Sequence, residues 1–484
     1  MGTLLKNWSY LLFSDISNSV INFIVFTILA RKLTPEGYGT FNIVLAEVAL
    51  FTVVASNVGA NHVVTREVTL YPEKTTSIFV NTSVLRLIGI FLAIILLFIY
   101  YYISDGFSSQ NIFFLLCLLM ALNVVWDLSE SVAFGHFTTK YTTIFNILFS
   151  LGWLLSVLLL PIGADDLLIV LIAYTLFFFI KSFGYFAIVS IKYIKYRNFD
   201  FHSSFNNDIC KSLLLMSLPY FVMRLFGAFS EQIPMLILDN KSGVDQVGYY
   251  SVGFRLIMPI TIAVNTGLRA VFPFITKLYY ENKSDFSKKI LNAFIFIFVG
   301  GTFISTLLIL FSEYWIPFLL GVSYVDAIIP FNFLAWFGVG MCCDLMLATL
   351  LSSTYKQNIL MVITIVDFGI SVIFLLLGVR YGAIGLALAK LVSLMICLAY
   401  HFVIIHKIFN VNLMNRSFLF SLLLYLGSIL ITSITASVFI KSLIVLLFWL
   451  LLYRCSDNPI RTCVMLINLK LNKNESSSNN CDIQ

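Results

Sequence analysis

Long apolar runs separated by short polar breaks occupy almost the whole of this 484-residue sequence. A helix that crosses the hydrocarbon core of a bilayer needs about 20 mainly apolar residues. The runs predict fourteen such helices, near residues 10–30, 39–61, 79–103, 111–133, 142–163, 167–191, 212–237, 247–272, 290–312, 326–351, 358–379, 383–406, 416–434 and 436–453. Because a chain inside lipid must pair its backbone polar groups internally, we predict an all-α integral membrane protein.

The composition excludes several classes of protein. Only 11% of the residues are charged and 60% are hydrophobic, whereas soluble domains carry about 25% charged residues. Soluble enzymes and nucleic-acid-binding proteins are therefore excluded. The eight cysteines form no C-x-x-C pair and no P-loop motif occurs, so we expect no disulfide framework, no metal, no cofactor and no nucleotide hydrolysis. The polar residues that interrupt the first run favour a retained span over a signal peptide.

Basic residues predict the orientation of the chain. If the N-terminus is cytoplasmic, nineteen Lys and Arg residues fall in the inner segments and five in the outer loops. Cytoplasmic loops of membrane proteins carry such an excess. Both termini are therefore predicted to be cytoplasmic, and the short outer connections leave no room for a folded outer domain.

A weak internal repeat predicts two parallel halves. Residues Glu36–Asn42 and Asp245–Ser251 align at an offset of 209, with an acidic residue, a glycine, an aromatic and a small polar residue in matching places. Six predicted spans separate the copies, so both enter the membrane in the same direction. We predict a six-helix lobe over 1–205, a second over 206–408, two additional transmembrane helices over 409–454 and a cytoplasmic tail over 455–484.

Charged residues inside the predicted spans are the candidate translocation path. Each costs about 2.5–3.5 kcal/mol at mid-membrane, so such residues usually face a cavity or a partner. The basic members are Arg86, Lys181, Arg224, Arg255, Arg269 and Lys390. Arginine donates a planar fork of N–H groups that suits phosphate oxygens, so the set favours an anionic substrate. Arg255 and Arg269 would be separated by about 21 Å along one helix, which indicates a path and not a single pocket.

Acidic residues in the same spans are candidates for ion coupling. They are Asp127, Glu130, Glu231, Asp344 and Asp367. Asp127 and Glu130 share a helix face, where like charge and low dielectric would favour protonation of one of them. For every residue in both sets a second interpretation stays open, namely a buried structural ion pair or a hydrogen-bonded cap.

Several motifs resemble one family of transporters. Residues Ala30–Asn42 resemble the first-loop motif of Wzx-type polysaccharide-export flippases, in the multidrug/oligosaccharidyl-lipid/polysaccharide superfamily. The second-half motifs are Val247–Ser251 with Pro273, Gly321 with Tyr324 and Ala327, and Tyr381–Ala389. The similarity runs to about residue 406.

This resemblance implies a MATE-like V of two six-helix lobes around a cationic cavity, in the bacterial inner membrane. It implies alternating access that moves an undecaprenyl-diphosphate-linked O-antigen or other polysaccharide repeat unit to the periplasmic leaflet, driven by H⁺ or Na⁺. By similarity the arginines would hold the diphosphate or acidic sugars. Membrane lipid, a polysaccharide polymerase and a chain-length regulator are the other partners it suggests.

Two other functions compete with the flippase hypothesis. A membrane glycosyl polymerase or ligase would act on the same carrier lipid, but such enzymes need a sizeable outer loop. A drug or metabolite exporter of the same superfamily would share the architecture. A site for cationic drugs should be acidic and aromatic, whereas the seventh and eighth predicted spans carry arginines.

Overall fold

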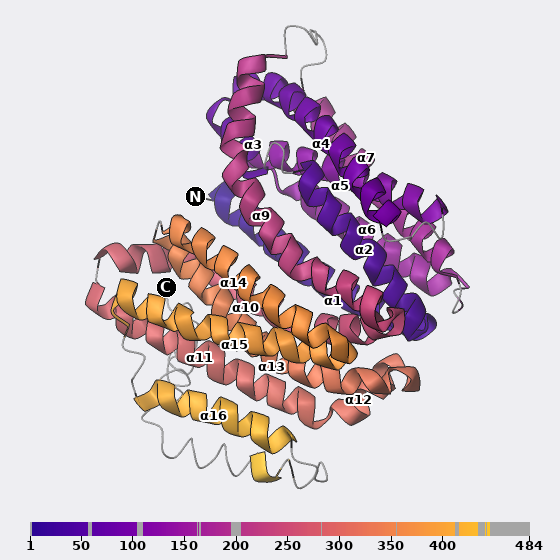
Figure 1. The fold of residues 1–484 in the computed structure, drawn as a ribbon. Helices are drawn as coiled ribbons and strands as arrows, with labels where there is room; N and C mark the ends of the chain where they lie inside the picture. Colours follow the sequence, from indigo (N-terminus) through magenta and orange to yellow (C-terminus); the bar gives the residue numbers. More distant parts are fainter. Residues whose placement is uncertain are drawn as a thin grey trace, which may run out of the picture. The chain divides into compact units, whose positions relative to one another are not determined.

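The computed structural model describes residues 2–56, 61–103, 110–161, 163, 166–194, 205–281, 283–354, 356–411, 416–433, 441 and 443–445. The longer helices are α1 (Gly2–Lys32), α2 (Pro35–Ser56), α4 (Thr75–Ile103), α5 (Gln110–Gly135), α6 (Lys140–Leu159), α7 (Leu167–Tyr193), α9 (Asn207–Ser242), α10 (Val244–Glu281), α11 (Lys283–Leu310), α13 (Ile328–Ser353), α14 (Gln357–Gly378), α15 (Gly382–Phe409) and α16 (Arg416–Ser433). The shorter ones are α3 (Asn61–Leu70), α12 (Ser312–Leu320), η1 (Pro72–Lys74), η3 (Val322–Ala327) and η4 (Val379–Tyr381). No strand occurs in these described ranges, and the all-α prediction is confirmed (Figure 1).

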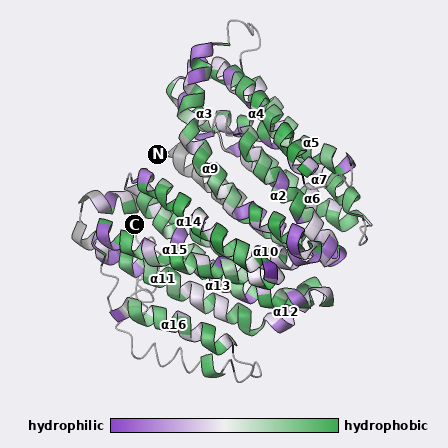
Figure 2. Cartoon of the chain, in the orientation of Figure 1, coloured by the Kyte–Doolittle hydropathy of each residue, from purple (hydrophilic) through white to green (hydrophobic). Residues whose placement is uncertain are grey.

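The helices match the predicted membrane spans closely. Ten helical stretches of described residues are long and apolar enough to cross a bilayer, and one of them, Asn358–Phe409, contains both α14 and α15. Hydrophobic residues run along the helices and hydrophilic residues gather toward their ends (Figure 2). The protein is thus a multi-pass membrane protein. The count of fourteen spans stays a prediction, because most of 436–453 and the whole of the tail lie outside the described residues.

Two short helices, α3 and α12, were not predicted. In α3, Val63, Val64 and Val68 are buried while Arg66 is exposed. Such a helix is too short to stand out from a loop by its apolar pattern, and burial of three valines against neighbouring helices stabilises it.

The described chain divides into two compact units. Unit 1 contains Met1–Pro259, Ile316–Phe331 and Met361–Lys390, and unit 2 contains Ile260–Trp315, Asn332–Leu360 and Leu391–Gln484. Unit 1 therefore holds the whole predicted first lobe together with segments from the predicted second lobe. The predicted lobe boundaries at 205/206 and 408/409 stay predictions.

Helix α2 is central to unit 1. It packs against α4, α5 and α9, and α9 runs alongside it (Figure 1). Helix α4 has one buried face that includes Leu85, Arg86 and Leu97, while Leu87 and Phe91 on its other face are exposed. An exposed apolar face is what a helix presents to lipid, so α4 lies at the lipid boundary of the unit.

In unit 2, α11 packs against α16. The Tyr425 ring of α16 meets the rings of Phe298 and Trp336, and its hydroxyl donates a hydrogen bond to the Trp336 carbonyl (3.2 Å). The hydroxyl is thereby paired inside an apolar interior, as a buried polar group must be.

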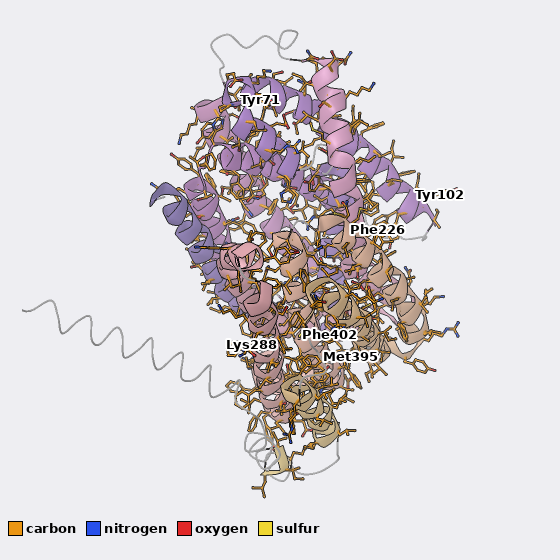
Figure 3. The ribbon with its side chains drawn as sticks, turned by 90° about the vertical axis from the view of Figure 1, so that its left-hand side faces the viewer. Tyr71, Tyr102, Phe226, Lys288, Met395 and Phe402 are labelled. Carbon is orange, nitrogen blue, oxygen red and sulfur yellow. The ribbon has the colours of Figure 1, made fainter. Side chains whose placement is uncertain are left out.

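Tyrosines mark both ends of the span formed by α4. Tyr71, which precedes it, and Tyr102, near its last residue, are 44% and 73% exposed (Figure 3). Tyrosine is enriched where the bilayer meets water, because its ring is apolar and its hydroxyl is polar. The stretch between them is therefore consistent with a complete crossing.

Candidate functional site

The structure gives Arg86 a packing role inside unit 1. Its side chain is 1% exposed, although it belongs to a span with a lipid-facing side. The guanidinium donates hydrogen bonds to the Val124 carbonyl (3.1 Å) and to Asn61 Oδ1 (2.5 Å). These bonds fasten α4 to α5 and α3. A direct role for Arg86 in the path stays a prediction.

Four helices bring five of the predicted residues within electrostatic range of one another. We call Arg86, Asp127, Glu130, Lys181 and Arg224 the charge cluster. Asp127 of α5 interacts with Arg86 of α4, Lys181 of α7 and Arg224 of α9. Lys181 interacts in turn with Glu130 and Asp127. Opposite charges grouped in this way lower the cost of placing ionised groups in a membrane.

Aromatic rings hold Lys181 in place. Its ammonium lies 4.0 Å from the ring centroid of Trp126 and 5.0 Å from those of Phe149 and Phe178. A cation over a ring face is stabilised by the ring quadrupole. Lys181 thus combines charge attraction with contacts to three aromatic rings.

Two charged residues of α9 are exposed although they lie within a span. Arg224 and Glu231 both belong to the apolar stretch Tyr220–Ser242, and both side chains are exposed. An ionised side chain at this depth is stable next to water and costly next to lipid. This exposure favours a wet surface along α9 over the interpretation that both residues are sealed structural pairs.

Lys390 is bound to the backbone of α9 one turn before Pro234. Pro234 has no N–H group, so the carbonyl of Ser230, four residues earlier, loses its usual helical donor. The Lys390 ammonium of α15 donates a hydrogen bond to this carbonyl at 2.6 Å, and the Lys390 side chain is 9% exposed. Lys390 therefore replaces the missing donor and joins α15 to α9 at Ser230.

Replacing Pro234 with alanine should uncouple Lys390 from α9. Alanine restores the N–H group that bonds Ser230, so Lys390→Met should then destabilise the protein little, whereas in the native background it should cost about 1–3 kcal/mol by leaving a buried carbonyl unpaired. Thermal unfolding of the two single variants and the double variant measures this coupling. Pro72→Ala, at an exposed site outside α9, is the control. Equal costs of Lys390→Met in both backgrounds would show that Lys390 does not replace the donor missing at Pro234.

The two copies of the repeat motif meet in unit 1. A Cβ atom on Gly39 of α2 would lie 2.1 Å from the Val244 carbonyl oxygen, and one on Gly248 of α10 would lie 2.1 Å from the Pro35 carbonyl oxygen. Gly39 and Gly248 occupy matching positions in the repeat. Only glycine lets two backbones approach so closely. We call this pair the glycine contact.

Further hydrogen bonds surround the glycine contact, at the end of the spans that the positive-inside rule predicts to face outward. Gln246 Oε1 accepts one from the Ala383 backbone N–H (3.0 Å), and the Ser242 hydroxyl donates one to the Val379 carbonyl (3.0 Å). The Tyr324 hydroxyl donates a long one to the Leu33 carbonyl (3.4 Å). The motif segments of the two predicted lobes are therefore joined at this end.

Arg255 lies two turns along α10 from Gly248. Its Nε and Nη2 atoms donate hydrogen bonds to Asn42 Oδ1 of α2 at 3.1 and 2.9 Å. Asn42 is 3% exposed, and its own Nδ2 donates to the Tyr38 carbonyl (2.7 Å). Arginine has five N–H donors, and three of those on Arg255 have no hydrogen-bond acceptor among the described residues. This partly exposed cation can therefore donate to an anionic group.

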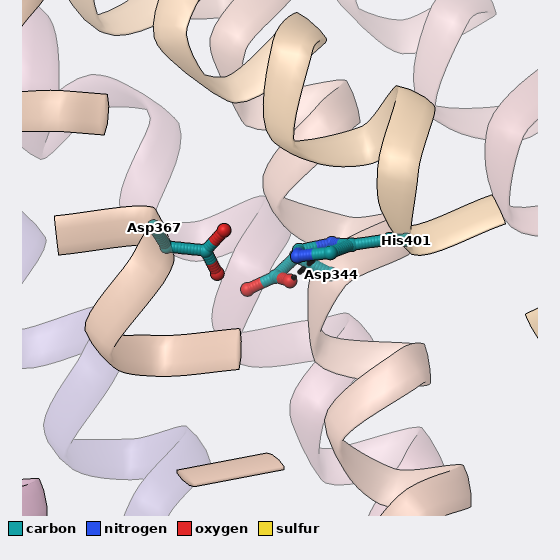
Figure 4. A group of neighbouring side chains, drawn as sticks. All are labelled: Asp344, Asp367 and His401. Carbon is teal, nitrogen blue, oxygen red and sulfur yellow. Dashed lines mark ion pairs between the residues drawn. The ribbon is translucent and has the colours of Figure 1, made fainter. Parts of the chain in front are cut away.

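In unit 2, Asp344 of α13 lies beside His401 of α15. His401 Nδ1 is 3.3 Å from Asp344 Oδ1, which makes an ion pair when the imidazole is protonated (Figure 4). His401 is 1% exposed and the Asp344 side chain 39%. Asp344 is thus accessible on one side and supported by histidine on the other.

Asp367 and Arg269 complete the set of predicted residues. Asp367 lies in α14 and is partly exposed. Arg269 lies in α10, and its side chain is outside the described residues.

Sequence reasoning missed Asn42 and His401. Asn42 stood at the end of the repeat motif, where a buried amide in a span is a signal for a polar partner. His401 was predicted to lie at the end of a span, and the apolar residues around it in the sequence did not predict a contact with a carboxylate on α13. That contact joins residues 57 positions apart, which periodicity within one helix does not detect.

Comparisons with known proteins agree with these observations. The sequence profile of the family described as "Polysaccharide biosynthesis protein" matches residues 4–279. The capsular polysaccharide biosynthesis protein CapF of Staphylococcus aureus is 23% identical over 420 residues, which cover 84% of this chain and 100% of CapF.

Solved transporters share the fold. The lipid II flippase MurJ in an inward closed conformation superposes with a TM-score of 0.67 at 14% identity, over 93% of this chain and 98% of MurJ. An inward-facing MATE family multidrug resistance transporter of the MOP superfamily gives a TM-score of 0.62 at 14% identity, over 82% of this chain and 98% of that protein. The predicted MATE-like fold is confirmed.

Proposed function

Because this chain belongs to the polysaccharide biosynthesis protein family, we propose that it is a flippase that moves a lipid-linked polysaccharide repeat unit across the membrane. The carrier is undecaprenyl diphosphate and the cargo an O-antigen or other polysaccharide unit. The unit moves from the cytoplasmic to the periplasmic leaflet of the bacterial inner membrane. The protein acts as a transporter and not as an enzyme.

The observation that carries this proposal is the hydrogen bonding of the Arg255 guanidinium. Two donors of this guanidinium within a span hold Asn42, and the other three have no acceptor in the part of the chain that the structure describes. Phosphate oxygens accept such donors well, because the fork of N–H groups matches their spacing. Arg224 is a second exposed cation on α9. We propose that both contact the diphosphate, and that Lys181, Lys390, Arg86 and Arg269 complete the positive potential of the path.

Alternating access needs ends that open and close in turn. The glycine contact and the bonds around it hold one end together, and none of these bonds is an ion pair. Neutral hydrogen bonds contribute about 0.5–1.5 kcal/mol each, so opening this end does not require these bonded groups to separate opposite charges in the membrane. We propose that it is the outer gate.

The carboxylates that we propose for ion coupling lie near other charged residues, beside a histidine, or at an exposed position within a span. Asp127 and Glu130 lie in the charge cluster, Asp344 lies beside His401, and Glu231 is exposed on α9. We propose that these residues, with Asp367, take up and release H⁺ or Na⁺ during the cycle.

Deletion of the gene tests the function. Complete lipid-linked repeat units should accumulate and stay inaccessible to a membrane-impermeant label applied outside spheroplasts, because they remain in the inner leaflet. The measurement is mass spectrometry of extracted carrier lipids with and without the label. Units that accumulate but are labelled would indicate a polymerase or ligase, and unchanged carrier lipids would indicate a drug or metabolite exporter.

A further inference from the structure

The ends of four spans in unit 1 form a basic and aromatic surface that is not part of the translocation path proposed above. Its members are Tyr71, Lys74, His136, Lys140, Tyr141, Lys192 and Tyr193, which we call the span-end patch. Tyr71 and Lys74 lie just before α4, Tyr71 ahead of η1 and Lys74 in it, and His136 follows the last residue of α5. The other members come from the start of α6 and the end of α7. The positive-inside rule predicts that this side faces the cytoplasm.

Direct contacts join these span ends. The His136 ring stacks on the Tyr193 ring with centroids 4.3 Å apart, and His136 Nε2 is hydrogen-bonded to the Thr75 hydroxyl (3.1 Å). The Lys192 ammonium lies 4.9 Å from the Tyr141 ring centroid and 5.3 Å from that of Tyr193. The patch is therefore one continuous surface and not a set of separate loops.

The patch carries net positive charge. Lys74, Lys140 and Lys192 are exposed, against one exposed acidic residue in the same turns, Glu73. Partial burial, with a smaller effect from Lys192, lowers the pKa of His136, so the imidazole is neutral near pH 7. The three lysines alone therefore supply the positive charge.

Aromatic rings hold two of the ammonium groups in place before a ligand binds. Lys192 rests over Tyr141 and Tyr193, and Lys74 lies 5.0 Å from the Tyr71 ring centroid. Ring contacts of this kind restrict the long side chains. When an anion binds, these lysine side chains therefore lose less conformational entropy than freely moving lysines would.

Apolar groups stand beside these charges. Phe137, next to His136, is 56% exposed, and Tyr71 is 44% exposed. A soluble anion has no apolar part that could contact such rings. A phospholipid does, because its phosphate is attached to glycerol and acyl carbons. Basic residues at the cytoplasmic ends of spans attract anionic lipids of that leaflet.

We propose that the span-end patch binds the phosphate of an anionic membrane phospholipid, with the lysines on the phosphate and the exposed rings on the glycerol and upper acyl chain. The site is separate from the charge cluster and from Arg255. It holds bulk lipid and not the transported substrate.

Lipid binding by the full-length protein tests this site without any transport assay. The protein, purified in a neutral detergent, is titrated with phosphatidylglycerol and with phosphatidylcholine, and bound lipid is counted by native mass spectrometry. The double variant Lys140→Gln/Lys192→Gln should bind phosphatidylglycerol roughly 25-fold more weakly, about fivefold for each lysine. Binding of phosphatidylcholine should not change.

Two controls accompany the titration. Lys288→Gln/Lys289→Gln removes two exposed lysines of α11 in unit 2 and should leave phosphatidylglycerol binding within about twofold of the native value. Lys192→Arg keeps the charge over the rings and should retain binding. Circular dichroism verifies that each variant is folded.

Three results would overturn the proposal. One is equal phosphatidylglycerol binding by the native protein and the Lys140/Lys192 variant. Another is an equal loss in the Lys288/Lys289 variant, which would mean a diffuse charge effect. The third is displacement of the lipid by millimolar inorganic phosphate, which would make the patch a site for soluble anions.

Discussion

Replacement of Arg255 by alanine should nearly abolish surface polysaccharide while the protein still inserts into the membrane. The variant removes two hydrogen bonds to the buried Asn42 and the three further N–H donors that we propose for the diphosphate. Hydrogen bonds to charged groups contribute about 1.5–3 kcal/mol each, so losing even one of them should slow transport roughly 10- to 150-fold. Gel analysis of surface polysaccharide, with immunoblots of membrane fractions for expression, provides the measurement.

Two further variants distinguish the loss of an anion-binding side chain at position 255 from a general effect of removing an arginine. Lysine at position 255 should retain part of the activity, because it keeps the charge but loses the fork of donors. Arg380→Ala, at an exposed arginine of η4, should leave polysaccharide unchanged. Native polysaccharide levels in Arg255→Ala would remove the residue from the path.

Alanine at Gly39 should also cause a severe loss of transport. The new methyl group would lie 2.1 Å from the Val244 carbonyl oxygen, well inside the van der Waals distance, and a backbone atom cannot turn away as a side chain can. Overpacking of this kind costs about 1–3 kcal/mol, which shifts the balance between joined and separated ends roughly 5- to 150-fold. Gly248→Ala should act in the same direction, because it presses on the Pro35 carbonyl oxygen.

The matched control is Gly227→Ala in α9. A Cβ atom there meets nothing within 4 Å, so the helix should tolerate it. The double variant Gln246→Cys/Ala383→Cys replaces two residues that a hydrogen bond joins at this end, and it adds no Cβ atom to either glycine. Crosslinking of this pair by a short reagent should fall when a further substitution, Asn42→Ala, weakens this end. If Gly39→Ala and Gly227→Ala support equal transport, the glycine contact is not part of the gate.

Much of the fold could be predicted from the sequence, because a bilayer leaves few choices. Runs near 20 apolar residues must be helices, and their ends follow from the polar breaks. The helices α2, α4 and α5 begin and end within a few residues of the predicted spans. Helix α3 was missed since its stability comes from three buried valines and not from its length.

The candidate site could be predicted only as a set of residues. Arg86 and Arg224 look alike in the sequence, each a lone arginine in an apolar run. In the structure Arg86 is sealed against the Val124 carbonyl, while Arg224 is exposed. Packing against neighbouring helices decides which side of a helix faces water. The sequence of an apolar run without a clear polar face does not predict that side.

The sequence by itself determined that this protein crosses a membrane as a set of helices, that its spans carry charged residues of both signs, and that two distant segments repeat one motif. These properties depend on local composition, because transfer from water to lipid acts on each segment separately. Only the tertiary structure decided that Gly39 and Gly248 of the repeat press against each other's helices, that Lys390 supplies the donor missing at Pro234, and that Arg255 holds Asn42. Each of those contacts joins residues more than 150 positions apart, and packing between helices, not the pattern within them, selects such pairs.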